Sequence, residues 1–77
     1  MRLCDGYPDK QYMVSEISLP QNLAKRLEVL GMTYGTPINI INKKGKGILI
    51  ISVRGTRLAL GENITKNIKV KEAAYEA

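Results

Sequence analysis

Two aliphatic segments separated by a short glycine-containing stretch constrain this fold more than any other feature of the sequence. The segments 38–43 and 48–53 flank residues 44–47, which contain two glycines. Short apolar runs joined by such a connection are typical of a β-hairpin. Residues 48–51 are apolar at every position. One face of this strand should therefore line a barrel, while the other needs cover from a helix, the N-terminal arm or a partner.

Further short strands are expected on both sides of this hairpin. Residues 11–17 predict a first strand whose alternation breaks at Glu16, which requires either a bulge or a strand end near Ser15. A tight turn at 54–56 leads into a short strand over 57–60. The chain therefore alternates short strands with tight turns through most of its length.

One helix is predicted, over residues 18–30. Its apolar stripe consists of leucines at helical spacing, namely Leu19, Leu23, Leu27 and Leu30. At its start, Ser18 and Gln21 fit a capping box. At its end, Gly31 supplies the left-handed residue of a Schellman ending, in which Met32 folds back on Leu27.

The predicted order of elements is a strand, a helix and four further short strands. Residues 61–67 form a connector with one helical turn, and Ile68 and Val70 face inward on the last strand while Lys69 and Lys71 face outward. Five short strands that close on themselves are typical of a small β-barrel. We therefore expect a mainly β fold, a small five-stranded barrel with one helix inserted after the first strand.

The length of 77 residues indicates a single domain over 1–77. Residues 1–10 are predicted to form an irregular arm that Leu3 and Tyr7 pin to the body. Residues 72–77 are predicted to form a frayed tail.

The composition argues against catalysis, secretion and membrane insertion. The chain has no histidine and one cysteine, so neither a histidine-activated nucleophile nor an intrachain disulfide can form. No stretch reaches the ~20 apolar residues of a membrane span, and no apolar run near the N-terminus resembles a signal peptide. We expect a cytoplasmic protein that is not an enzyme and does not itself span a membrane.

Few residues could bind a metal or react. Cys4 lies beside Asp5 with no fixed basic neighbour, which favours an incidental cysteine over a reactive thiol. Asp5 and Asp9 could offer oxygen ligands, but a selective metal site needs several preorganised ligands. We predict no catalytic residue, no metal site and no cofactor. Five glycines are assigned to structural turns and caps: Gly31, Gly35, Gly45, Gly47 and Gly55.

The formal net charge of +5 favours acidic partners, nucleic acid or an anionic membrane surface. Three lysines, Lys43, Lys44 and Lys46, crowd one hairpin tip, while Arg54 and Arg57 flank another turn. A nucleic-acid-binding or regulatory small β-barrel is therefore an alternative function. No aromatic residue stands beside either basic set in the sequence, so nucleic-acid binding without sequence specificity is the expectation.

Several segments, taken in order, resemble the ferrous iron transport protein A (FeoA) family. They are RLEVLGM at 26–32, GTPI at 35–38, IISVRGTRLAL at 50–60 and NIKV at 67–70. The resemblance covers about residues 6–70. It implies an SH3-like barrel with an inserted helix, similar to the C-terminal domain of DtxR-type metal-dependent repressors.

The resemblance also implies a function. Members of the family are small cytosolic accessory proteins of ferrous iron transport systems, and they work with FeoB, a membrane transporter with a cytosolic GTPase domain. We expect an interaction module for such a transporter. Family analogy alone also implies transition metal ion binding, in the form of weak Fe²⁺ association. Aliphatic surface near the helix and the central hairpin is predicted to stay exposed and to dock on the transporter's cytosolic region. Its basic rim would consist of Lys25, Arg26, Arg54 and Arg57. The alternative is that the helix and the N-terminal arm bury all of this surface.

Overall fold

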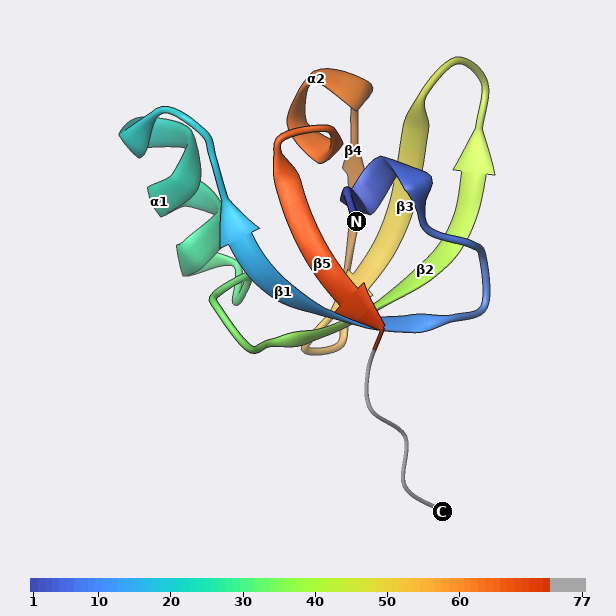
Figure 1. The fold of residues 1–77 in the computed structure, drawn as a ribbon, viewed down its shortest axis with the longest axis horizontal. Coiled ribbons are helices and arrows are strands. Elements are labelled where there is room, and N and C mark those ends of the chain that lie inside the picture. Colours follow the sequence, from blue (N-terminus) through green and yellow to red (C-terminus); the bar gives the residue numbers. More distant parts are fainter. Residues whose placement is uncertain (73–77) are drawn as a thin grey trace.

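A computed structural model describes residues 1–72, and in it five antiparallel strands form one strongly curved sheet (Figure 1). The strands are β1 (Gln11–Ile17), β2 (Pro37–Lys44), β3 (Ile48–Val53), β4 (Thr56–Leu60) and β5 (Ile68–Glu72). The helices are the 3-10 helix η1 (Leu3–Asp5), the main helix α1 (Gln21–Val29) and the single turn α2 (Glu62–Thr65). The mainly β fold with one helix inserted after the first strand is confirmed, as is the helical turn in the connector.

The strand order in the sheet is β4-β3-β2-β1-β5, so β4 and β5 are its two edges. The N-terminal arm covers the edge of β5. The amide of Val70 donates to the carbonyl of Met1 at 2.7 Å, and the amino group of Met1 donates to the carbonyl of Val70 at 3.1 Å. Arg2 forms an isolated β-bridge with Lys69 beside them. The arm therefore continues the sheet past β5.

The predicted irregularity in the first strand is a β-bulge. The register between β1 and β5 shifts between Val14 and Glu16, and pairing resumes with Glu16 opposite Lys69 and Ile17 opposite Ile68. The extra residue returns Ile17 to the inner face of the sheet, where it packs against the core. A second register shift, between Ile40 and Asn42 of β2, was not anticipated.

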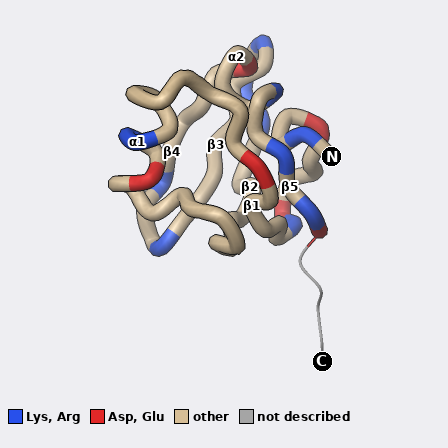
Figure 2. Tube along the Cα trace, turned by 60° about the vertical axis from the view of Figure 1, so that its left-hand side comes forward, with Lys and Arg blue, Asp and Glu red and all other residues tan. Residues whose placement is uncertain are grey.

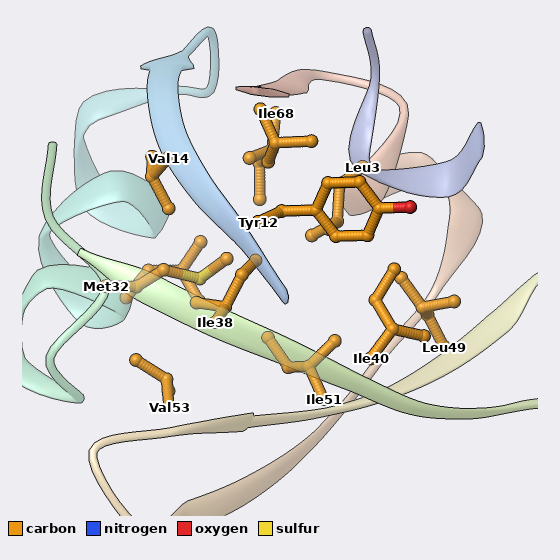
Figure 3. Packing of buried hydrophobic residues seen from close by; sticks show 12 residues of the cluster. Leu3, Tyr12, Val14, Met32, Ile38, Ile40, Leu49, Ile51, Val53 and Ile68 are labelled. Carbon is orange, nitrogen blue, oxygen red and sulfur yellow. The ribbon is translucent and has the colours of Figure 1, made fainter. Parts of the chain in front are cut away.

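The core is aliphatic apart from one tyrosine and one methionine (Figure 3). Its buried members are Leu3, Tyr12, Val14, Leu27, Met32, Ile38, Ile40, Leu49, Ile51, Val53, Ile68 and Val70. On β5, Ile68 and Val70 are buried while the lysines between and beyond them are exposed, as predicted. The alternation along β1, β2, β3 and β5 supplies most of the core, because successive side chains of a strand point to opposite faces.

The N-terminal arm is held by one of its two predicted anchors. Leu3 is fully buried, whereas the side chain of Tyr7 is 63% exposed, so the prediction for Tyr7 was wrong. The Tyr7 backbone amide instead donates to the buried hydroxyl of Tyr12 at 2.9 Å. This bond satisfies a phenol that would otherwise lose its hydrogen-bond partner on burial.

Helix α1 starts three residues later than predicted, and the expected capping box is absent. The hydroxyl of Ser18 donates to the carboxylate of Glu16 at 3.1 Å, so it is not placed to cap the helix. Pro20 is the N-cap residue without a side-chain bond, and its carbonyl accepts from the amides of Leu23 and Ala24. Proline still suits this position because it has no amide hydrogen of its own to satisfy.

The C-terminal end of α1 is the predicted Schellman ending. The amide of Gly31 donates to Glu28 and that of Met32 donates to Leu27, both at 2.9 Å. Gly31 has a φ of 102°, a conformation that side chains with a β-carbon disfavour. The ending directs Met32 into the core, where it is fully buried.

The predicted tail, 72–77, begins one residue too early. Glu72 is the last residue of β5, opposite Tyr12, and its carboxylate lies 3.7 Å from the ammonium of Lys10. Residues 73–77 lie outside the described part of the chain. Within residues 1–72, no helix is long and apolar enough to cross a bilayer.

Candidate functional site

An apolar groove of about 500 Å³ lies between α1, the end of β4 and α2. Its lining residues are aliphatic apart from one arginine: Leu23, Arg26, Leu27, Val29, Leu30, Leu60 and Ile64. In Figure 1, α1 stands to one side of the strands and α2 lies above them. The groove is therefore a hollow between elements that the sheet itself does not fill.

The leucine stripe of α1 is divided between the core and this groove. Leu27 is buried, whereas Leu30 is 43% exposed and its neighbour Val29 is 86% exposed. Leu23 is half-buried on the groove wall. The predicted exposure of aliphatic surface beside the helix is thus confirmed. Apolar side chains left open in a cluster usually mark an interaction site.

The structure separates the four basic residues predicted to rim the docking surface. Arg26 lines the groove directly. Arg54 lies in the β3–β4 turn, and its Cδ would stand 2.5 Å from a β-carbon on Gly31, so its stem covers the C-terminal end of α1. A cation there suits the carbonyl end of a helix. Figure 2 shows the basic positions along α1 and the strands.

The remaining two basic residues lie further from the groove. Arg57 is exposed on β4, where it pairs with Ser52 of β3. Lys25 lines a different shallow hollow, of about 230 Å³, together with the exposed Tyr34. Arg26 is therefore placed to meet a ligand of the groove, Arg54 and Arg57 follow the β3–β4 hairpin, and Lys25 faces another side of α1.

A polar cavity of about 200 Å³ lies beside the N-terminal arm, and residues of the arm, of the β2–β3 hairpin and of α2 line it. The guanidinium of Arg2 donates to Asp5 at 3.1 Å, and this bond lowers the pKa of the Asp5 carboxyl. Burial, followed by the charge of Asp5, raises the pKa of the Cys4 thiol. The thiol is therefore protonated at neutral pH and a poor nucleophile or metal ligand.

The same cavity contains Glu62 and the fully buried Thr65, whose hydroxyl has no hydrogen-bond partner within residues 1–72. Glu62 packs on the hairpin, because its Cβ would lie 2.8 Å from a β-carbon on Gly47. Across residues 1–72, no three His, Cys, Asp or Glu side chains gather closely enough to hold a metal ion. The donor set of the cavity thus offers scattered polar groups without the cluster that a transition metal prefers.

The glycines assigned to turns all adopt left-handed backbone. Gly35 has a φ of 79°, Gly45 of 54°, Gly47 of 78° and Gly55 of 78°. Arg54 also has a positive φ, of 51°, so both central residues of the β3–β4 turn are left-handed, as a type I′ hairpin turn requires. These residues shape turns and do not line the groove.

Sequence reasoning missed three residues of the groove. Val29 is an apolar residue outside the leucine stripe of α1, and this departure from the pattern is a signal that could have marked it. Leu60 and Ile64 belong to a strand end and a connector. Tertiary structure alone brings them opposite α1, so no local pattern could identify them.

The curved five-stranded sheet, the inserted helix and the open groove define a small SH3-like barrel that presents a surface instead of an enclosed pocket. The family model described as the FeoA domain matches residues 1–72. The chain therefore belongs to the FeoA domain family, and the predicted resemblance is confirmed.

Solved structures agree with this assignment. A crystal structure described as iron uptake regulatory protein (FeoA) is 28% identical, with 94% of this chain and 96% of that chain covered and a TM-score of 0.83. The FeoA protein from Chlorobium tepidum is 19% identical, with 100% and 74% covered and a TM-score of 0.90. A search of curated proteins finds no match.

A repressor shares the same fold. The manganese-activated repressor ScaR is 19% identical, and 94% of this chain matches 35% of that chain with a TM-score of 0.81. The likeness extends to the fold of the repressor's C-terminal SH3-like domain, as the sequence resemblance predicted.

Proposed function

We propose that this protein is an accessory component of a ferrous iron transport system and docks on the cytosolic region of an FeoB-type transporter. Membership of the FeoA domain family supports the transport role. The observation that carries the docking role is the open aliphatic groove with Arg26 on its wall. This role places the protein in the cytoplasm and requires no catalytic residue.

The groove has the properties of a protein-binding surface. Its exposed apolar members, Val29 and Leu30, lie at the C-terminal end of α1, and partly buried Leu60 and Ile64 form the opposite wall. Apolar anchors that fill such a hollow supply most of the affinity of an interface. Arg26 adds positive charge on the groove wall, which speeds encounter with an acidic partner.

The proposal is tested by measuring binding of the purified chain to the purified cytosolic region of the transporter from the same cell. Val29→Glu places a charge in the groove at a position that is already exposed, so the melting temperature should barely change. Binding should weaken by about tenfold or more, since a carboxylate in an apolar contact loses its hydration.

Asn22→Glu is the matched control, because it adds the same charge to an exposed position of α1 that does not line the groove. It should bind like the parent chain. Absence of binding by the parent chain would refute the docking role. Equal loss of binding in both variants would show that the helix charge matters and the groove does not.

A further inference from the structure

The two edges of the sheet differ in whether their outward-facing backbone groups are hydrogen-bonded. The arm covers β5 through paired bonds between Met1 and Val70. By contrast, no strand within residues 1–72 pairs with the outer edge of β4. That open edge ends at Leu60, which is also a wall of the apolar groove. The unpaired backbone and the apolar hollow are therefore neighbours.

The register of the β3–β4 hairpin identifies the unpaired backbone groups. Val53 pairs with Thr56 across a two-residue turn, and the closing pair of such a hairpin exchanges hydrogen bonds. Bonded and non-bonded pairs then alternate along the strand. The N–H and C=O groups of Arg57 and Ala59 consequently point away from β3, and both residues are exposed.

We propose that an extended segment of the partner adds to the outer edge of β4 as a sixth strand. The backbone of Arg57 and Ala59 would bond to that segment, while its inward-facing apolar side chains would enter the groove beside Leu60. Main-chain bonds then supply affinity and the groove supplies specificity. This inference rests on the docking role proposed above and specifies the form of the partner's contact.

The charges of the surface decide between two occupants of this edge. Antiparallel pairing of two β4 strands would bring Arg57 of each copy close together, and like charges across strands are destabilising. The chain as a whole also carries a formal charge of +5. An acidic segment with apolar residues at alternate positions instead complements Arg26 and Arg57. The favoured occupant is therefore a transporter segment of this kind and not a second copy.

Amide hydrogen exchange tests the backbone contact in the parent protein. The amides of Arg57 and Ala59 should exchange freely in the isolated chain and slow by about tenfold or more in complex with the transporter's cytosolic region. The amide of Val70, already bonded to the arm, should not change. Unchanged exchange at both β4 amides in a saturated complex would overturn strand addition.

A proline substitution tests the same contact by affinity. Ala59→Pro removes an outward N–H without removing a bond to β3, and proline is tolerated at such edge positions. Binding should weaken by about tenfold through the lost bond and the clash of the ring with an incoming strand. Ala59→Thr, which keeps the N–H, should bind within about twofold of the parent chain.

The outcomes separate this inference from the docking role. Loss of binding in Val29→Glu, with parental binding in Ala59→Pro and no slowed amides, would retain the groove and reject strand addition. Failure of the parent chain to bind would reject both. Should Ala59→Pro unfold, the exchange measurement on the parent chain decides alone.

Discussion

Aliphatic residues are buried on one side of this small sheet, beside the N-terminal arm, and exposed on the other side, beside α1. On the arm side, Leu3 is fully buried, and a β-carbon on Gly6 would collide with the side chain of Ile40. On the helix side, Leu30 and Val29 remain open to solvent. The arm side is packed around Leu3 and its small cavity is polar, whereas the helix side keeps apolar surface and a β4 edge that no strand of residues 1–72 pairs with. The difference places more of the buried core on the arm side, and the docking role proposed above uses the helix side.

The largest effect should come from a pair of identical truncations, one on each side. Leu3→Ala should lower the free energy of unfolding by about 2–5 kcal/mol, since it leaves a cavity in the core. Leu30→Ala should lower it by about 1 kcal/mol or less, since much of that side chain is already in water. Chemical denaturation of both variants measures the difference. Equal losses of unfolding free energy in the two variants would contradict this difference between the two sides.

The second effect concerns Gly31, which follows α1 and directs Met32 into the core. Gly31→Val should lower the free energy of unfolding by about 1 kcal/mol or more, through backbone strain at its positive φ. The contact with the Arg54 side chain adds to the loss. Gly45→Val is the control for the contact with Arg54. Gly45 also has a positive φ, so it carries the backbone strain, but it has no neighbouring atom within 4 Å. A parental melting temperature for Gly31→Val would contradict the assigned helix end.

A third, smaller effect is kinetic. Arg26→Glu should slow association with the transporter's cytosolic region by about fivefold at low salt, with little change in melting temperature. Lys44→Glu makes the same charge change on the exposed hairpin tip, away from the groove, and should slow association less. Stopped-flow or biolayer measurements at two salt concentrations compare the variants. Equal slowing would mean that net charge, and not the groove, guides the encounter.

Nucleic acid should bind weakly and without sequence preference. The exposed lysines of the hairpin tip can neutralise only a few phosphates, and no aromatic residue adjoins them in the sequence as a stacking platform. Fluorescence anisotropy with single-stranded RNA over a salt series measures this binding. Sequence-selective binding that persists at ~0.2 M salt would favour the alternative function.

The smallest effect is expected from Fe²⁺. Anaerobic calorimetry on the isolated chain should show weak binding or none, because the described residues lack a His, Cys and carboxylate cluster. The Cys4 thiol does not compensate, since burial raises its pKa. A stoichiometric micromolar site would contradict this expectation, and Cys4→Ser would then test whether the thiol is a ligand.

Local chemistry explains which parts of the fold were predictable from sequence. Gly31, Gly45 and Gly55 mark the helix end and two turns because left-handed backbone is rarely compatible with other residues. The helix start was less predictable, since Ser18 could bond either a backbone amide or Glu16, and only the folded chain selects Glu16.

The groove and the open edge were not predictable for a different reason. Alternation along β4 shows which side chains face inward, but not whether a neighbour pairs with its outer edge. Leu60 and Ile64 meet α1 through contacts between elements that are distant in sequence. The sequence predicted exposed aliphatic surface near the helix and the central hairpin, because the leucine stripe can cover only part of the outward-facing aliphatic residues, but it did not identify Val29 and Leu30 as the exposed side chains.

The position of β1 in the sheet has a consequence for synthesis of the chain. β1 lies between β2 and β5, and it pairs with the last strand across most of the sequence, as at Ile17 and Ile68. During translation, Tyr12 and Val14 therefore emerge long before the strand that completes their burial. Pairings this distant in sequence slow folding. The growing polypeptide must keep its first strand unpaired on one side until nearly all of the domain has left the ribosome.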